Sequence, residues 1–260
     1  MPGLLSTIST IHMNTKISSS IIMRIKKFGE SDLLINFFTI DQGILKGVAK
    51  GALKSRKRFA NCLDLFCMSN IEYDIKDKNG LHFLHSGKLL QAFPGLRNNF
   101  TSLSLASYMV ELTETLFPQG ICEKEMFELL KKAFLILDKG TANLKPLRIF
   151  FEARAMALGG YEIDFDRCCD CKRPYTGQGT AIFNKNKGGI ACLRCQKESE
   201  YFPSLDPAMV KNLICLQAGT PSPAWLTKSE KINGQGKVLK LHLNFHLGKN
   251  LTTAKYLADY

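Results

Sequence analysis

The chain has 260 residues, 45% of them hydrophobic, which is enough to bury the core of one large domain or of two to three small ones. Its formal net charge of +12 at pH 7 and its isoelectric point near 9.3 favour a partner that is a polyanion or an anionic surface. The longest apolar run near the start, residues 33–40, is too short to span a bilayer, and residues 1–16 lack the features of a signal peptide. We therefore expect a cytosolic protein without a membrane partner.

The N-terminal third of the chain has the pattern of a small β-domain. Residues 1–17 show no clear period, and we expect a loose leader there, with Met13 as a possible internal start. From residue 18 onward, short apolar runs alternate with turn signals, which is typical of strands. The expected strands are residues 19–24, 33–39, 44–49, 63–73 and 81–89. Five short strands joined by turns favour a closed β-barrel of the OB type over residues 18–95.

Positive charge is concentrated in this predicted barrel, because residues 24–58 alone carry a net charge of +6. The loop at residues 50–59, between the third and fourth expected strands, contains five basic residues and no acidic one. Cationic side chains on a flexible, glycine-containing loop can follow a phosphate backbone. The alternative is a solvated turn without a partner. The predicted DNA-binding residues are Arg24, Lys26, Lys46, Lys50, Lys54, Arg56, Lys57 and Arg58.

Aromatic side chains in the same region could stack on unpaired bases. The candidates are Phe28, Phe37, Phe38, Phe59 and Phe66. Alternation along a strand sends at least one of Phe37 and Phe38 inward, so we expect these two to belong to the barrel core.

The hydrophobic period changes from two to about 3.6 near residue 100, which predicts a helical domain over residues 96–165 and 204–260. Its first three helices are expected between residues 101 and 118, 126 and 140, and 146 and 159. Asp206 and Pro207 then mark the start of another helix. Residues 239–247 alternate apolar and polar side chains, and this period alone predicts a strand. His242 and His246 would share a face if the stretch were helical, but no carboxylate motif there supports a metal pair.

Two Cys-x2-Cys pairs separated by twenty residues predict a zinc ribbon at residues 166–203, which is inserted into the all-helical domain. Zinc requires four ligands at tetrahedral corners, and two intervening residues let one turn aim both thiolates at one ion. The predicted ligands of one structural zinc ion are Cys168, Cys171, Cys192 and Cys195. Cys169 leaves the choice of the first ligand open, and disulfides or free thiols are the alternatives. The glycine-rich segment between the pairs should bury little, so metal would supply most of its folding energy.

Catalytic motifs are missing from the sequence. Residues 47–55 lack the second glycine and the lysine of a phosphate-binding loop, and there is no His-Glu-x-x-His motif or nucleophile elbow. A zinc-dependent nuclease or deaminase would need an open position on the metal, which four thiolates would close. We therefore expect no enzyme. A further alternative is an interaction scaffold whose basic face binds an acidic partner tail.

The order of these features resembles the RecO family of bacterial DNA repair and recombination mediators. The matching pieces, besides the paired cysteines and the basic residues 54–58, are Phe28-Gly29-Glu30-Ser31-Asp32-Leu33-Leu34, Val48-Ala49-Lys50-Gly51-Ala52 and His246-Leu247-Gly248-Lys249. The resemblance implies an N-terminal OB barrel, a helical domain and a zinc module that only some members carry. It also implies that residues 239–247 are helical, and we follow the family there.

The same resemblance implies a function in the RecF pathway, in the cytoplasm and close to the nucleoid. Such proteins bind single- and double-stranded DNA and promote strand annealing. They contact the single-strand-binding protein (SSB) and work with RecR to load recombinase onto coated single strands. We therefore expect a DNA-binding mediator that contains one structural zinc ion.

Overall fold

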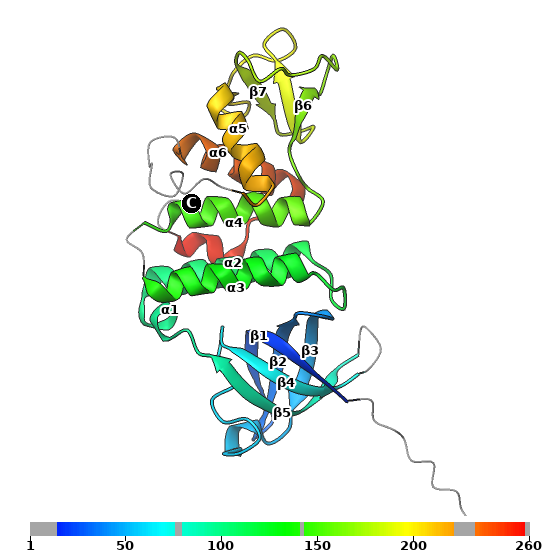
Figure 1. Ribbon diagram of the computed structural model, residues 1–260, viewed down its shortest axis with the longest axis vertical. Coiled ribbons are helices and arrows are strands. Elements are labelled where there is room, and N and C mark those ends of the chain that lie inside the picture. The colour runs from blue at the N-terminus through cyan, green and yellow to red at the C-terminus, as the bar shows by residue number, and fades with distance from the viewer. Residues whose placement is uncertain (1–14, 76–79, 141–142, 221–231, 258–260) are drawn as a thin grey trace, which may run out of the picture. The chain divides into compact units, whose positions relative to one another are not determined.

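The computed structural model describes residues 15–75, 80–140, 143–220 and 232–257. These residues form two compact units (Figure 1). The N-terminal unit contains the described residues up to Ala92 together with the segment Gln119–Cys122. The C-terminal unit contains the remaining described residues. The first 14 residues of the expected leader, with Met13, lie outside the described residues, and the first strand already begins at Thr15.

The N-terminal unit is a closed barrel with the strand order β1-β2-β3-β5-β4. Its strands are β1 (Thr15–Phe28), β2 (Asp32–Thr39), β3 (Gly43–Ala49), β4 (Met68–Asp74) and β5 (His82–Gln91). The pairing of β3 with β5 is parallel, and the other pairings are antiparallel. β1 pairs with β4 through its first half and with β2 through its second half, with a register shift between Ile22 and Arg24. The expectation of a β-rich, OB-like N-terminal domain is confirmed.

Alternating side chains fill the interior of the barrel. Ile35, Phe37 and Leu84 are buried there together with Tyr73. The rings of Phe37 and Tyr73 meet edge to face, with their centroids 5.5 Å apart. Phe38 is also fully buried, so both phenylalanines that we assigned to the core lie in it.

The fourth strand starts later than its sequence predicts. Within the expected strand 63–73 only the part from Met68 is extended, because the chain bends at Phe66, whose φ is +67°. The Phe66 N–H donates a 2.8 Å hydrogen bond to the carbonyl of Ile22, and the Ile22 N–H donates a 2.9 Å bond to the carbonyl of Cys67. These bonds hold the end of the β3–β4 connection against β1.

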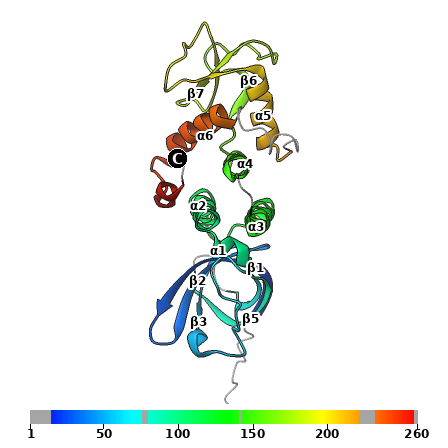
Figure 2. The ribbon, with the colours of Figure 1, turned by 90° about the vertical axis from the view of Figure 1, so that its left-hand side faces the viewer.

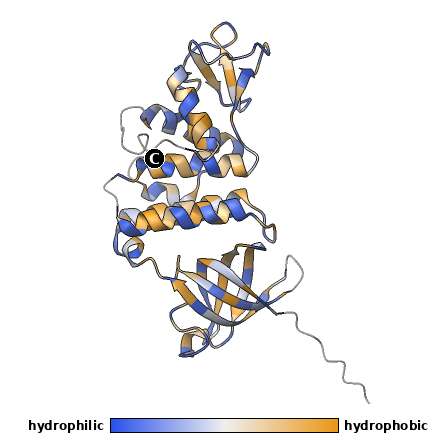
Figure 3. Ribbon diagram, in the orientation of Figure 1, coloured by the Kyte–Doolittle hydropathy of each residue, from blue (hydrophilic) through white to orange (hydrophobic). Residues whose placement is uncertain are grey.

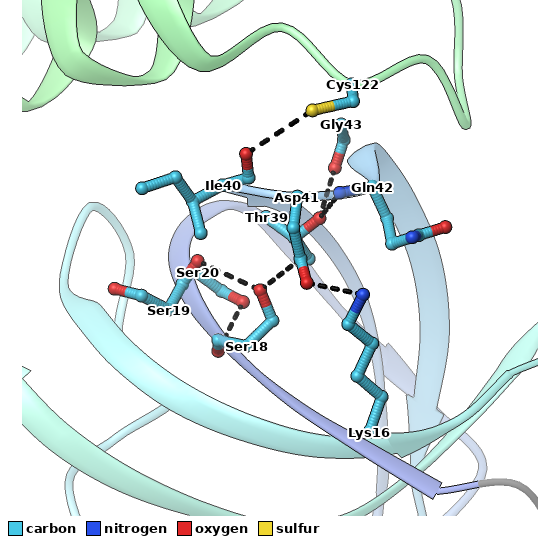
Figure 4. A network of polar contacts seen from close by, with 10 residues as sticks. All are labelled: Lys16, Ser18, Ser19, Ser20, Thr39, Ile40, Asp41, Gln42, Gly43 and Cys122. Atoms are coloured by element: carbon cyan, nitrogen blue, oxygen red, sulfur yellow. Dashed lines mark hydrogen bonds and ion pairs between the residues drawn. The ribbon is translucent and has the colours of Figure 1, made fainter.

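A polar network holds the turn between β2 and β3 (Figure 4). The hydroxyl of Thr39 donates a 3.0 Å hydrogen bond to the carbonyl of Gly43. In the same turn, the carboxylate of Asp41 accepts a 2.5 Å hydrogen bond from the Ser18 hydroxyl. It also forms an ion pair with the Lys16 ammonium at 2.5 Å. The turn is therefore tied to the start of β1.

The segment Gln119–Cys122 adds to this network from a distant part of the sequence. The Gly120 N–H donates a 3.0 Å hydrogen bond to the carbonyl of Ile44 in β3. The Cys122 thiol lies 3.6 Å from the carbonyl of Ile40, to which it donates (Figure 4). These four residues, which lie far from β2 and β3 in the sequence, thus cover the β2–β3 turn of the barrel.

We predict that Gly43→Ala destabilises the N-terminal unit much more than Gly29→Ala does. Both glycines have a positive φ, +72° and +69°, so alanine should cost about 1–2 kcal/mol at each position. A Cβ at position 43 would also lie 1.8 Å from the carbonyl oxygen of Ile121, whereas nothing lies within 4 Å at Gly29. Relief of that overlap should cost about 1–3 kcal/mol more. Thermal unfolding measures both variants, and equal melting temperatures would contradict the close approach.

The C-terminal unit is mainly helical. Its α-helices are α1 (Pro94–Asn98), α2 (Phe100–Leu116), α3 (Lys124–Lys139), α4 (Lys145–Leu158), α5 (Pro207–Gln217) and α6 (Ile232–Leu247), followed by the 3-10 helix η3 (Thr252–Tyr256). Figure 2 shows α2, α3 and α4 nearly end-on, and Figure 3 shows apolar and polar positions mixed along each of them. The expected helices are confirmed, whereas α1 is too short to give a periodic signal. Among the helices in the described ranges, none combines the length and the hydropathy needed to cross a bilayer.

Residues 239–247 belong to α6, as the family resemblance implies and contrary to their alternation. Val238, Leu239 and Leu243 are buried at helical spacing, with at most 1% of each exposed. In a strand, Leu239, Leu243 and Phe245 would share one face. In the helix Phe245 turns away and is 46% exposed. The alternation is therefore a coincidence of composition, and tertiary packing decides the structure.

A small sheet lies between α4 and α5 in sequence, with the order β6-β8-β7-β9. Its strands are β6 (Asp164–Cys168), β7 (Ala181–Asn184), β8 (Gly189–Cys192) and β9 (Ser204–Leu205). Phe183 and Ile190 of this ribbon are buried in one cluster with Ile149, Leu213 and Leu239 of the helices. Our expectation that the ribbon buries little is wrong, because its central hairpin extends the helical core.

Candidate nucleic-acid interface and metal centre

Strand register brings basic residues together on the outside of the barrel. Arg24 of β1 lies opposite Asn36 of β2, and Asn36 lies opposite Lys46 of β3. Arg24 and Lys46 are exposed, and Lys46 is the one exposed residue of β3. Lys26 is two residues beyond Arg24 and therefore faces the same side of β1. Arg24, Lys26 and Lys46 therefore form a basic row from β1 to β3, with Asn36 of β2 between them.

The basic loop after β3 is held in place at its start. The backbone N–H of Gly51 donates a 2.8 Å hydrogen bond to the carboxylate of Asp32, and the Leu53 N–H donates a 3.0 Å bond to the carbonyl of Ser31. The short 3-10 helix η1 (Ala52–Lys54) follows. We expected a flexible loop here. The structure instead anchors the loop to the β1–β2 turn, because two donors of the loop have fixed acceptors.

Arg58 anchors the far side of the same loop. Its guanidinium donates a 2.7 Å hydrogen bond to the carbonyl of Lys50 and lies 5.3 Å from the centre of the Phe59 ring. Its carbonyl accepts a 2.8 Å bond from the N–H of Gly87 in β5. Arg58 thus has a structural role that its charge alone does not reveal.

Three cationic side chains of the loop, those of Lys54, Arg56 and Lys57, are exposed. Within the described part of the chain, no hydrogen bond or ion pair of these side chains is recorded. A rigid backbone that presents exposed cations reduces the conformational entropy lost when a polyanion binds. Sequence reasoning missed Ser31 and Asp32 as the residues that fix this backbone, although they lie in the turn that carries the family resemblance.

Most of the aromatic stacking candidates are unavailable. Phe37, Phe38, Phe59 and Phe66 are at most 5% exposed, and Phe37 and Phe59 belong to the core cluster of the barrel. Of the five, Phe28 is the accessible one, with 53% of its surface exposed at the end of β1. Among these five phenylalanines, only Phe28 is therefore accessible for base stacking. Positive charge is the main feature of the basic face of the barrel.

Four thiols gather in the ribbon. The Sγ atoms of Cys168, Cys171, Cys192 and Cys195 all lie within 4.8 Å of one another. Around a tetrahedral zinc ion with bonds of about 2.3 Å, sulfur atoms would lie about 3.8 Å apart. The distance between the Cys171 and Cys192 sulfurs is 3.8 Å. The group is thus positioned to hold a metal ion, and a shell of four thiolates would leave no position for a reacting water.

Cys169 lies outside this group. Its thiol donates a 3.6 Å hydrogen bond to the carboxylate of Asp170, and its backbone N–H donates a 2.7 Å bond to the carbonyl of Ile190. Cys168, in contrast, is 3% exposed, and its sulfur accepts a 3.3 Å bond from the backbone N–H of Cys192. Adjacent side chains in an extended chain point to opposite faces. β6 ends at Cys168 and a turn begins at Cys169, and this arrangement brings only Cys168 into the four-thiol group.

The histidine pair of α6 consists of the buried His242 and the partly buried His246. The rings of His242 and His246 lie 4.4 Å apart, and the Nε2–H of His242 donates a 2.7 Å hydrogen bond to the carbonyl of Tyr161. Burial lowers the pKa of His242 to about 4, so the ring is neutral near pH 7. In the described ranges, no third histidine, cysteine or carboxylate joins the pair as a metal-binding group. The His242 ring packs beside Phe183 of the ribbon, and the His246 ring packs beside Tyr161.

Family comparison covers nearly the whole chain. The family model described as "Recombination protein O N terminal" matches residues 13–93, and the model described as "Recombination protein O C terminal" matches residues 97–255. The chain belongs to the RecO family. RecO proteins function in DNA repair and recombination, which is consistent with the basic face of the barrel.

Curated relatives are similar to this RecO family member along most of their own length. The DNA repair protein RecO of Syntrophus aciditrophicus (strain SB) is 32% identical over 255 residues, which cover 95% of this chain and 98% of the relative. That of Desulfatibacillum aliphaticivorans is 33% identical over 247 residues, covering 93% and 96%. That of Geobacter sulfurreducens is 26% identical over 239 residues, covering 92% and 95%.

We predict that Cys171→Ser abolishes stoichiometric metal binding by this RecO family member, whereas Cys169→Ser retains it. Only the first substitution removes a sulfur from the four-thiol group. Loss of a ligand should also lower the melting temperature, but the buried β7–β8 hairpin should keep the helical core folded. Elemental analysis by mass spectrometry, with thermal unfolding of both variants, measures this. Equal metal content in the two variants would contradict the assigned ligand set.

Proposed function

We propose that this RecO family member is a non-enzymatic mediator that binds single- and double-stranded DNA through its N-terminal barrel. The proposed contacts are the basic row across β1–β3 and the loop after β3, with Lys54, Arg56 and Lys57 as the main phosphate ligands. The observation that carries the proposal is the anchored loop with its exposed cations. Each neutralised phosphate releases condensed counterions, so affinity should fall steeply with salt.

Strand annealing follows from the same charges. Two single strands repel each other as polyanions, and a cationic surface between them lowers that repulsion. In the RecF pathway such a surface would help to exchange SSB for recombinase on single strands, together with RecR. The mediator would act by binding and by neutralising charge, and no step requires it to make or break a covalent bond.

The ion that we propose for the four-cysteine group is zinc, in a structural role. Four thiolates at this separation suit the size and softness of zinc, and all four coordination positions would be filled. Zinc would hold β6 and the turn after β8 together at the end of the ribbon. DNA affinity per folded molecule should then depend little on the metal.

We predict that changing Lys54, Arg56 and Lys57 together to alanine weakens DNA binding and flattens its salt dependence. For single-stranded DNA the slope of log affinity against log salt concentration should fall in magnitude by about two, at roughly 0.7 per phosphate contact. Fluorescence anisotropy with a labelled oligonucleotide at several salt concentrations measures the slope. Arg58 is left intact because the bond from its guanidinium to the carbonyl of Lys50 shapes the loop.

A matched control removes the same charge elsewhere. Lys124, Lys132 and Lys139 are exposed on α3, and their replacement by alanine lowers the net charge equally. This control should keep nearly the full salt slope. If both triple variants lose affinity to the same extent, binding reflects net charge and not the barrel face.

A second candidate function is the capture of an acidic partner tail by the C-terminal unit. A pocket of about 350 Å³ between α4 and α6 is lined by four basic residues and by Glu152. The basic residues are Lys145, Arg148, Lys237 and Lys240. Such a pocket would suit the carboxylates of an acidic peptide with an apolar end, and SSB is the partner that we propose for it.

Polar groups at the floor of this pocket contact one another. Glu152 is fully buried, and this burial raises the pKa of its carboxyl, while the nearby Arg148 charge and the Tyr108 hydroxyl act in the opposite direction. Tyr108 donates a 2.8 Å hydrogen bond to the Glu152 carboxylate, and the Arg148 guanidinium lies 3.9 Å from it. The pocket floor is therefore internally paired, whereas Lys237 is exposed on α6.

We predict that Lys237→Glu weakens binding of a labelled acidic peptide that ends in an aromatic residue by at least about tenfold. Like-charge juxtaposition at an interface costs several kcal/mol, which is the reason for this size of effect. Lys211→Glu on α5 makes the same charge change on an exposed helix outside the pocket and should have little effect. Equal losses in the two variants, measured by anisotropy, would remove this pocket as the peptide site.

A further inference from the structure

The N-terminal unit has an open hollow of about 740 Å³ beside the basic loop. One wall comes from Ile25 of β1 and Leu33 of β2. The other comes from Phe59 and Leu63, which follow the loop. Phe59 and Leu63 are core residues, and Ile25 and Leu33 pack against the same core while remaining partly accessible. The floor of the hollow is therefore apolar and backed by the barrel interior.

An exposed apolar side chain stands at the edge of this hollow. Leu53, in η1, lines it and is 46% exposed. Leu53 is also fixed, because its N–H donates to the carbonyl of Ser31. Apolar surface that is continuous from the partly accessible floor of a hollow to an exposed side chain at its edge is characteristic of a binding site.

The rim of the hollow is polar and mostly cationic. Lys27 and Arg56 line it from opposite walls and are exposed. Ser55, Asn61 and Asp64 add a hydroxyl, an amide and a carboxylate. Two cations suit an anionic backbone at the mouth, and the hydroxyl, amide and carboxylate can exchange hydrogen bonds with the polar edge of a planar ring.

An unpaired nucleobase has this combination of properties: two apolar faces, a polar edge and a phosphate on either side. We propose that the hollow receives one unpaired base of single-stranded DNA, with the flanking phosphates near Lys27 and Arg56. The inference rests on the proposed function, because it places part of the DNA ligand beside the same basic loop. Paired bases are stacked, and their extraction from a duplex costs a few kcal/mol, so the hollow favours single strands.

The test fills the hollow without changing its charge. Ala60 lines the hollow and is exposed, so Ala60→Phe occupies part of its volume. Binding of a single-stranded oligonucleotide should weaken about fivefold or more, the loss expected for one stacked base, while binding of the corresponding duplex stays unchanged. Leu90→Phe adds bulk at an exposed position of β5 outside the hollow and should change neither.

A second measurement varies the DNA. An oligonucleotide with abasic positions should bind the wild-type protein more weakly than the intact strand does, and this difference should shrink in Ala60→Phe, because both changes remove the same contact. Leu53→Ser provides the same comparison without added bulk if Ala60→Phe lowers the melting temperature. The inference would be overturned if the abasic positions weakened binding equally in the wild-type protein and in the variants. It would also be overturned if Ala60→Phe lost affinity equally for single-stranded and duplex DNA.

These outcomes are separable from failure of the proposed function. If the wild-type protein shows no salt-dependent DNA binding, the barrel is not a DNA site, and the inference fails with it. If salt-dependent binding is retained and is identical in wild type and Ala60→Phe, the charged face binds DNA and the hollow alone is excluded.

Discussion

Closure of the barrel between β3 and β5 is the constraint on which the N-terminal unit depends. These strands pair in parallel, and β4, which follows β3 in the sequence, lies on the far side of β5. The chain therefore needs a long connection from the end of β3 to the start of β4. Ordering a long connection costs conformational entropy, which contacts at its two ends must offset. Asp32 and Ser31 fix its beginning, and Ile22 fixes its end. The same connection carries the exposed cations, so the closure of the fold also sets the shape of the basic face.

The ribbon combines two sources of stability in one small sheet. One end of the sheet has the four thiols, which are positioned to hold a metal ion, whereas the central hairpin is buried against α4, α5 and α6. Small metal-bound modules often fold only with their ion, because they lack an apolar core. Here Phe183 and Ile190 are buried in the same hydrophobic core as residues of the helices. The ribbon is thus better described as an edge of the helical unit than as an independent module.

Sequence patterns predicted the elements whose signals are local, and missed the features that depend on distant residues. The barrel strands, the long helices and the paired cysteines follow from periodicity, turn residues and ligand spacing. The late start of β4 depends on a bond between Phe66 and Ile22, and the choice of Cys168 over Cys169 depends on where β6 ends. At residues 239–247 a strand period lies in a helix, because Val238 and Leu243 pack into a core formed by other segments. The basic residues were visible in the sequence, but the anchored backbone beneath them was not.

The contribution of Gln119–Cys122 to the barrel means that the polypeptide enters the N-terminal unit twice. A gene fragment that ends at Ala92 encodes all five strands but omits the bridge between Ile44 and Gln119 and the bond from Gly120 to Ile44. It would leave the β2–β3 turn uncovered. The N-terminal unit is therefore not encoded by one continuous stretch of the gene. Recombination between relatives would have to exchange this four-residue segment together with the barrel that it covers.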